Sequence, residues 1–151
     1  MKKIFVAIIL IFTALIIFKF NEEKIYIAAE IEHSTENIAS VDAKKGTPLV
    51  ISFVHSVQKT PVIEELEFDG ENFILLRTRY KSQGVGLPFM ESDGVFYEDN
   101  GWFIMDEMNR SIKKLELRTG VDTQLTINLA GQEFKLYEKF PAGTKIIIEA
   151  H

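Results

Sequence analysis

The predicted fold is organised around one stretch of the sequence, Ser52-Phe-Val-His-Ser-Val-Gln-Lys-Thr-Pro-Val-Ile-Glu-Glu65. An apolar, β-branched stretch stops at a polar segment that contains a proline and then resumes, which is typical of two antiparallel strands joined by a tight loop. With residues 58–61 as a four-residue loop, apolar side chains fall on one face of both strands. This register predicts that His55 faces Glu64 on the core side of the hairpin.

Further strands are predicted on both sides of this hairpin. Alternating apolar and polar residues indicate strands over residues 24–32 and 72–80, and the pairs Asp69-Gly70 and Asn100-Gly101 indicate tight turns. The polar segment 33–45 is interpreted as a loop. About nine strands, separated by turns at roughly regular spacing, predict an all-β fold, either an antiparallel β-sandwich or a barrel.

The first 20 residues have the character of an export signal. Two lysines precede residues 4–18, an apolar run in which Thr13 is the polar exception. Because small residues suited to a signal peptidase do not follow this run, we expect residues 1–20 to be an uncleaved signal anchor, a single transmembrane helix; cleavage is the alternative. The positive-inside rule then places the N-terminus in the cytoplasm and residues 21–151 outside the cell membrane, as one extracytoplasmic β-domain.

Composition excludes several classes of protein. The 151 residues fit one domain and a targeting segment. Residues after position 20 hold 14 basic and all 22 acidic side chains, a net charge of −8, which argues against a nucleic-acid partner. The absence of cysteine excludes disulfides, thiolate metal sites and thiol nucleophiles.

Four motifs stand out along the chain: the hairpin segment 55–65, Thr78-Arg-Tyr80, Gly84-Val-Gly-Leu-Pro88 and Gly101-Trp102. Together they resemble one family of small bacterial exported proteins, the domain of unknown function DUF1850. The resemblance runs from about residue 49 to residue 102, and the combined spacing is more specific than any one motif.

The resemblance implies a role in solute uptake, because members are commonly encoded beside, or fused to the membrane subunit of, tripartite ATP-independent periplasmic (TRAP) transporters of the TAXI type. We therefore expect a membrane-anchored accessory protein that contacts the permease or the substrate-binding protein of such a transporter. Where the family usually has a glutamate, this chain has Gln58. The positions that match the family motif are His55, Thr60, Pro61, Glu65, Arg79, Gly84, Gly86, Leu87, Pro88 and Trp102.

Candidate binding residues lie on the hairpin and on the strand and loop after it. An imidazole directly opposite a carboxylate can share a hydrogen bond, so His55 and Glu64 are either a structural pair or a ligand-contacting, pH-responsive one. A guanidinium suits bidentate binding of organic acids, so Arg79 favours a small-ligand or pH-sensing module as the alternative function. The predicted binding residues are His55, Thr60, Pro61, Glu64, Glu65, Arg79, Tyr80, Gly84, Gly86, Leu87 and Pro88.

We do not predict an enzyme. His55 and Ser56 are consecutive in a predicted strand and point to opposite faces, so they cannot form a nucleophile and base pair. The neighbouring Glu64 and Glu65 are disfavoured as paired acid and base for the same reason. The three histidines have no spacing that suggests a metal site, and we expect neither metal nor cofactor.

Overall fold

The computed structural model describes residues 23–32, 34–84 and 86–151, so the expected signal anchor at residues 1–20 lies outside the described residues. The described residues contain twelve strands and two single-turn helices, η1 (Glu91–Asp93) and α2 (Leu136–Lys139). No helix within them is long and apolar enough to cross a membrane. The strands are β1 (Lys24–Ile31), β2 (Ser34–Asp42), β3 (Thr47–Val54), β4 (Pro61–Phe68), β5 (Phe73–Tyr80), β6 (Val95–Asp99), β7 (Trp102–Asp106), β8 (Arg110–Ile112), β9 (Lys114–Arg118), β10 (Thr126–Leu129), β11 (Gln132–Lys135) and β12 (Lys145–Ala150).

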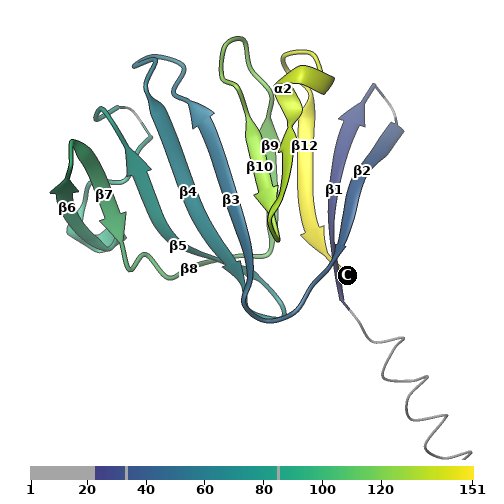
Figure 1. Ribbon diagram of the computed structural model, residues 1–151, viewed down its shortest axis with the longest axis horizontal. Coiled ribbons are helices and arrows are strands. Elements are labelled where there is room, and N and C mark those ends of the chain that lie inside the picture. The colour runs from purple at the N-terminus through teal and green to yellow at the C-terminus, as the bar shows by residue number, and fades with distance from the viewer. Residues whose placement is uncertain (1–22, 33, 85) are drawn as a thin grey trace, which may run out of the picture.

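The strands form two antiparallel sheets that do not close on themselves. The smaller sheet has the order β2-β1-β12-β9, and the larger has the order β11-β10-β3-β4-β5-β7-β6, with β8 paired to the first residues of β5. Figure 1 shows β6 and β7 at one side of the molecule and β1 and β2 at the other. The prediction of an all-β antiparallel fold is confirmed.

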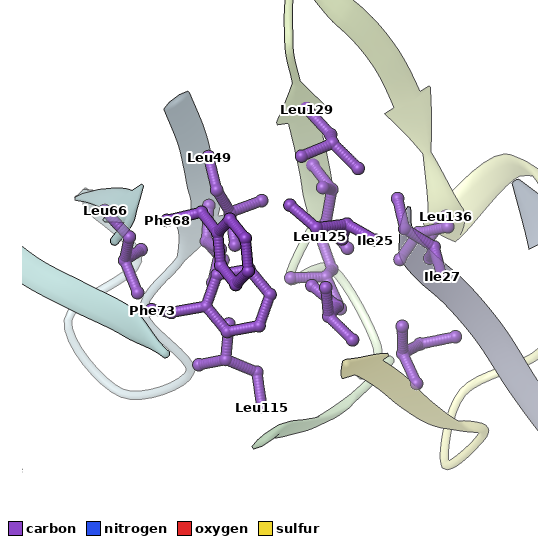
Figure 2. Close-up of a cluster of buried hydrophobic side chains, with 14 of the residues drawn as sticks. Ile25, Ile27, Leu49, Leu66, Phe68, Phe73, Leu115, Leu125, Leu129 and Leu136 are labelled. Carbon is purple, nitrogen blue, oxygen red and sulfur yellow. The ribbon is translucent and has the colours of Figure 1, made fainter. Parts of the chain in front are cut away.

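The hydrophobic core joins the two sheets. Alternation in β1 places Ile25 and Ile27 on the inner face of the smaller sheet, where they are fully buried. Leu49 of β3 and Phe68 of β4 are fully buried on the larger sheet and belong to the same cluster. Figure 2 shows the side chains of this cluster converging from the surrounding strands. The cluster contains no residue of β6 or β7.

The segment 33–45, predicted to be a loop, contains strand β2 instead. β2 pairs along β1 from Ser34 to Asp42 and forms one edge of the smaller sheet. Most side chains of β2 are exposed, as is common at a sheet edge. Its apolar residues Ile38, Ala39 and Val41 are only partly buried against the core, and they do not form a regular alternation. The polar composition of this segment therefore does not reveal the strand, because a strand is recognised in a sequence by alternating buried residues.

The predicted register of the central hairpin is wrong. The structure pairs Val54 with Pro61 and Ile51 with Glu64, so the connecting loop is residues 55–60 and His55 is not opposite Glu64. The apolar pattern continues to Val57 and therefore predicts a four-residue loop, but the side chain of Val57 is exposed at the loop tip. The strands end earlier because the His55 imidazole organises a turn of its own.

Strand β5 contains a bulge that changes which residues face inward. The register with β4 shifts between Glu65 and Leu66, leaving one residue of β5 unpaired. Leu75 is buried before the shift and Thr78 after it, so the inward positions change parity within one strand. The side chains of Arg77 and Arg79 share the outer face, and Leu76 is not on the face of Thr78.

Candidate functional site

The loop of residues 55–60 is built around His55. Its imidazole is 8% exposed, and its Nδ1 accepts hydrogen bonds from the backbone N–H groups of Val57 and Gln58, each at 3.2 Å. The backbone N–H of Lys59 donates to the His55 carbonyl at 2.9 Å, with Lys59 in the left-handed region at φ 53°. An acceptor at Nδ1 fixes the side chain as the cap of a short turn.

The glycine loop, formed by the described residues of 81–90, lies directly against this turn. A Cβ atom at Gly84 would stand 3.1 Å from Cε1 and 3.2 Å from Nε2 of His55, and 3.1 Å from Cγ of Gln58. The Ser82 hydroxyl and the Gln58 amide oxygen form a long hydrogen bond of 3.5 Å between the two loops. Gly84 therefore allows the two motif-bearing loops to touch, although they are about 30 residues apart in sequence.

Tyr80 anchors the other end of the glycine loop. Its side chain is fully buried, and its hydroxyl donates to the Pro88 carbonyl at 2.5 Å. Burial, followed by the nearby negative charge of Asp93, raises the pKa of Tyr80, so the hydroxyl keeps its proton as a donor. Gly86 adopts φ 86°, a left-handed conformation that glycine tolerates best, and this lets the chain return toward Pro88.

Together these two loops form one surface, which we call the loop face: residues 55–60 and the described residues of 81–90. Three large apolar side chains protrude from it, Val57 at 71%, Phe89 at 63% and Met90 at 56% exposure. Isolated exposed apolar residues are ordinary on protein surfaces. Here they stand on loops that are tied to each other and to buried anchors, so the apolar positions are fixed by the fold.

A second feature, the inner cleft, lies behind the glycine loop on the inner face of the larger sheet. It has a volume of about 510 Å³ and is lined by Glu64, Leu75, Thr78, Gly86, Leu87, Pro88, Phe89, Ser92, Asp93, Met108 and Arg110. Burial raises the pKa of Glu64, and the positive charge of Arg110 opposes this rise. The described residues provide no hydrogen bond or ion pair within 4 Å to the Glu64 carboxylate.

A third feature, the arginine cluster, lies on the outer face of the larger sheet. Arg79 forms an ion pair with Glu65 at 2.7 Å, and Arg77 forms one with Asp106 at 2.6 Å and a longer one with Glu65 at 3.6 Å. The Arg77 guanidinium lowers the pKa of Asp106, which in turn raises the pKa of Arg77. The carboxylate partners of both arginines thus come from the chain itself.

Aromatic rings border the arginine cluster. The indole of Trp102 has Lys81 Nζ at 4.4 Å and Arg79 Cζ at 5.8 Å from a ring centroid, distances typical of cation–π contacts. The Tyr97 hydroxyl donates to Asp106 at 3.2 Å. Trp102, Arg79 and Glu65, which match the family motif, therefore belong to one network on the outer face, where the side chain of Trp102 is half-buried.

The predicted site residues fall into these three places. The loop face contains His55, Thr60, Gly84, Gly86, Leu87 and Pro88, with Pro61 at the start of β4 and Tyr80 buried as the anchor of Pro88. The inner cleft is lined by Glu64 and also by Gly86, Leu87 and Pro88. The arginine cluster contains Glu65 and Arg79. The structure does not bring His55, Glu64 and Arg79 together. Sequence reasoning missed Asp106 and Arg110, which come from later strands, and no local pattern marks either of them. The described residues contain no group of three or more histidine, aspartate or glutamate side chains that could hold a metal ion.

Comparison with protein families decides the relationship that the motifs suggested. The model of the domain of unknown function DUF1850 matches residues 49–136. The chain belongs to the DUF1850 family. The DUF1850 match begins in β3 and ends at the first residue of α2, so it contains the loop face, the inner cleft and the arginine cluster. Among curated proteins and solved structures, the comparisons find no match.

Proposed function

We propose that this DUF1850 protein is a membrane-anchored, extracytoplasmic accessory protein of a TAXI-type TRAP transporter. In this proposal it acts by protein–protein contact, without catalysis, and binds the permease or the substrate-binding protein through the loop face. The anchor is the N-terminal apolar segment, which holds the β-domain at the outer side of the membrane.

The observation that carries this proposal is the construction of the loop face. Motif residues of the two loops contact each other: Gly84 packs against His55, and the Tyr80 hydroxyl donates a hydrogen bond to the Pro88 carbonyl. The result is a surface whose two loops are held by these contacts, with Val57, Phe89 and Met90 exposed. Preorganised apolar side chains at a surface favour association, because little conformational entropy is lost when a partner covers them.

The alternative function requires His55, Glu64 and Arg79 to form one organic-acid or pH-sensing site. The geometry does not favour it, because the three side chains occupy the loop, the inner cleft and the outer face respectively. The Arg79 guanidinium already contacts the Glu65 carboxylate. A ligand-binding role therefore has to be argued from the cleft alone.

The test is affinity purification of the tagged chain from native membranes, followed by detection of the transporter permease and substrate-binding protein. The altered protein carries Val57→Ser and Phe89→Ser, which remove exposed apolar contacts and leave the turn bonds of His55 in place. Val95→Ser is the matched control, because Val95 is 51% exposed on β6, outside the loop face. All three proteins are first compared by circular dichroism and thermal unfolding.

We expect the parent and the Val95→Ser control to recover transporter subunits and the double variant to lose them. Equal recovery by all three proteins would show that the loop face is not the contact surface. If the parent recovers no transporter subunit under conditions in which a tagged permease recovers its substrate-binding protein, the accessory function is wrong.

A further inference from the structure

The inner cleft exists because the core cluster stops short of β6 and β7. At the edge of the cluster, where Leu75 still belongs to it, the inner face of the larger sheet is lined by Leu75 and Thr78 of β5, and the segment 86–93 stands over it. Figure 1 shows this end of the larger sheet on the side away from β1 and β2. The cleft is therefore a space between a sheet and a loop, with rigid strands as its floor.

Two side chains of opposite charge line this space without joining each other. Glu64 projects from β4, and Arg110 from β8, which pairs with the early part of β5. The described residues provide no ion pair within 4 Å and no side-chain hydrogen bond for either group. Burying a carboxylate is unfavourable unless a partner compensates it. Burial raises the pKa of Glu64, and the positive charge of Arg110 offsets that rise only in part.

The rest of the lining is largely apolar. Leu75, Leu87, Phe89 and Met108 supply aliphatic and aromatic walls, and the Thr78 hydroxyl is turned toward the Met108 sulfur at 3.4 Å. Asp93 adds a second carboxylate beside the backbone N–H of Met90. At about 510 Å³ the cleft lies within the range of small-molecule sites, which is roughly 300–1,000 Å³.

We propose that the inner cleft binds a free, zwitterionic α-amino acid with an apolar side chain. Arg110 takes the ligand carboxylate, because a guanidinium binds planar carboxylates well. Glu64, with Asp93 nearby, takes the ligand ammonium, and the walls formed by Leu75, Leu87 and Phe89 cover its side chain.

A ligand of a single charge fits this lining less well. A simple carboxylic acid would leave Glu64 without a partner and would meet two carboxylates against one guanidinium. A simple amine would leave Arg110 unused. A ligand that carries both charges on one carbon satisfies both groups, and its apolar side chain uses the remaining walls.

The test is isothermal titration calorimetry on the purified full-length chain with L-leucine and L-phenylalanine. Two analogues of leucine are titrated beside them: 4-methylpentanoate, which lacks the ammonium, and isopentylamine, which lacks the carboxylate. We expect at least one amino acid to bind, and each analogue to bind about tenfold or more weakly than leucine if leucine is the ligand, because each loses a charge-assisted hydrogen bond.

Matched variants locate the site. Glu64→Gln and Arg110→Gln each remove one charge of the cleft and are expected to weaken binding about tenfold or more. The controls are Glu67→Gln, on the opposite face of β4, and Arg118→Gln, whose guanidinium donates to the Gly143 carbonyl in another part of the chain. Both controls are expected to leave the affinity unchanged.

Three results would overturn the proposal. The first is the absence of heat and of thermal stabilisation with both amino acids at millimolar concentration. The second is binding of an analogue as tightly as leucine, which would assign the cleft to a ligand of single charge. The third is equal loss of affinity in Glu64→Gln and Glu67→Gln, which would place the ligand elsewhere. None of these results depends on whether the loop face binds a transporter.

Discussion

The contact between Gly84 and His55 leads to a sharp prediction about Gly84→Ala. An added methyl group would lie 3.1 Å from Cε1 and 3.2 Å from Nε2 of the His55 ring, closer than the optimal separation of about 3.5–4.0 Å between carbon atoms. The ring cannot move away freely, because its Nδ1 holds two backbone N–H groups. The nearby Gln58 side chain is exposed and can turn aside.

The expected magnitude follows from two opposing effects. Overpacking a fixed neighbour costs about 1–3 kcal/mol. Alanine restricts the unfolded chain more than glycine does and returns about 0.4–1 kcal/mol, since the φ of Gly84 lies outside the left-handed region. We expect Gly84→Ala to lower the free energy of unfolding by about 1–2 kcal/mol, which corresponds to a fall in Tm of roughly 2–8 °C for a chain of this size.

The assay is urea unfolding of four proteins: the parent, Gly84→Ala, His55→Ala and the double variant. If the methyl group acts through the imidazole, removing the ring removes the cost, and the two substitutions show a coupling of about 1 kcal/mol or more. Gly46→Ala is the control. Gly46 has φ 91° and no atom within 4 Å of an added Cβ, so its cost comes from the backbone and should not change with His55→Ala.

A fully additive pair of substitutions would refute this reasoning. It would mean that Gly84→Ala acts on the glycine loop alone and that the contact with His55 is not tight in solution. A Gly84→Ala variant as stable as the parent would lead to the same conclusion.

Three further predictions concern single groups. His55→Asn, which keeps an acceptor near the position of Nδ1, should retain more stability than His55→Ala, by about 1 kcal/mol in urea unfolding. The raised pKa of Glu64 means that the parent loses stability as pH rises through that folded-state pKa; Glu64→Gln should lack this loss and be the more stable protein at neutral pH, as a pH series of melting temperatures would show. The lowered pKa of Asp106 has the opposite sign: its stabilisation is present above the pKa of the unfolded chain and is lost as pH falls through the folded-state value. Asp106→Asn should therefore flatten the acid limb of the stability curve, by about 1 kcal/mol or less because the Arg77 and Asp106 side chains are 37% and 23% exposed.

The sequence predicts those strands in which buried and exposed residues alternate. β1 alternates clearly, and Asn100-Gly101 forms the predicted turn between β6 and β7 with both residues at positive φ. β2 shows no such alternation because it is an edge strand whose side chains are mostly exposed. The predicted hairpin register is wrong because hydrogen bonds to the His55 side chain replace backbone pairing at the end of the strand. An alternating apolar pattern does not reveal this replacement.

The candidate site was predictable only where it is local. The two loops were identified from their motifs, and the pairing of Arg77 with Arg79 on one face follows from strand alternation. Asp106 and Arg110 could not be assigned, because their neighbours are set by the order of strands in the sheet. The bulge in β5 compounds this, since one unpaired residue changes which side chains reach the inner cleft.

The end of the larger sheet that lacks a facing sheet also has a consequence for local unfolding. β6 and β7 are held to the rest of the sheet by the short ladder in which Thr78, Arg79 and Tyr80 of β5 pair with β7, and by the ion pair between Arg77 and Asp106. Opening this end breaks that ladder and pulls on the segment 86–93, which lines the inner cleft and leads into β6, whereas the main core cluster contains no residue of β6 or β7. Amide hydrogens of β6 and β7 should therefore exchange with solvent through a partial opening that is less costly than global unfolding. Any molecule that occupies the inner cleft or covers the loop face would raise the free energy of that opening, so the exchange rates of this hairpin would report occupancy from outside the site itself.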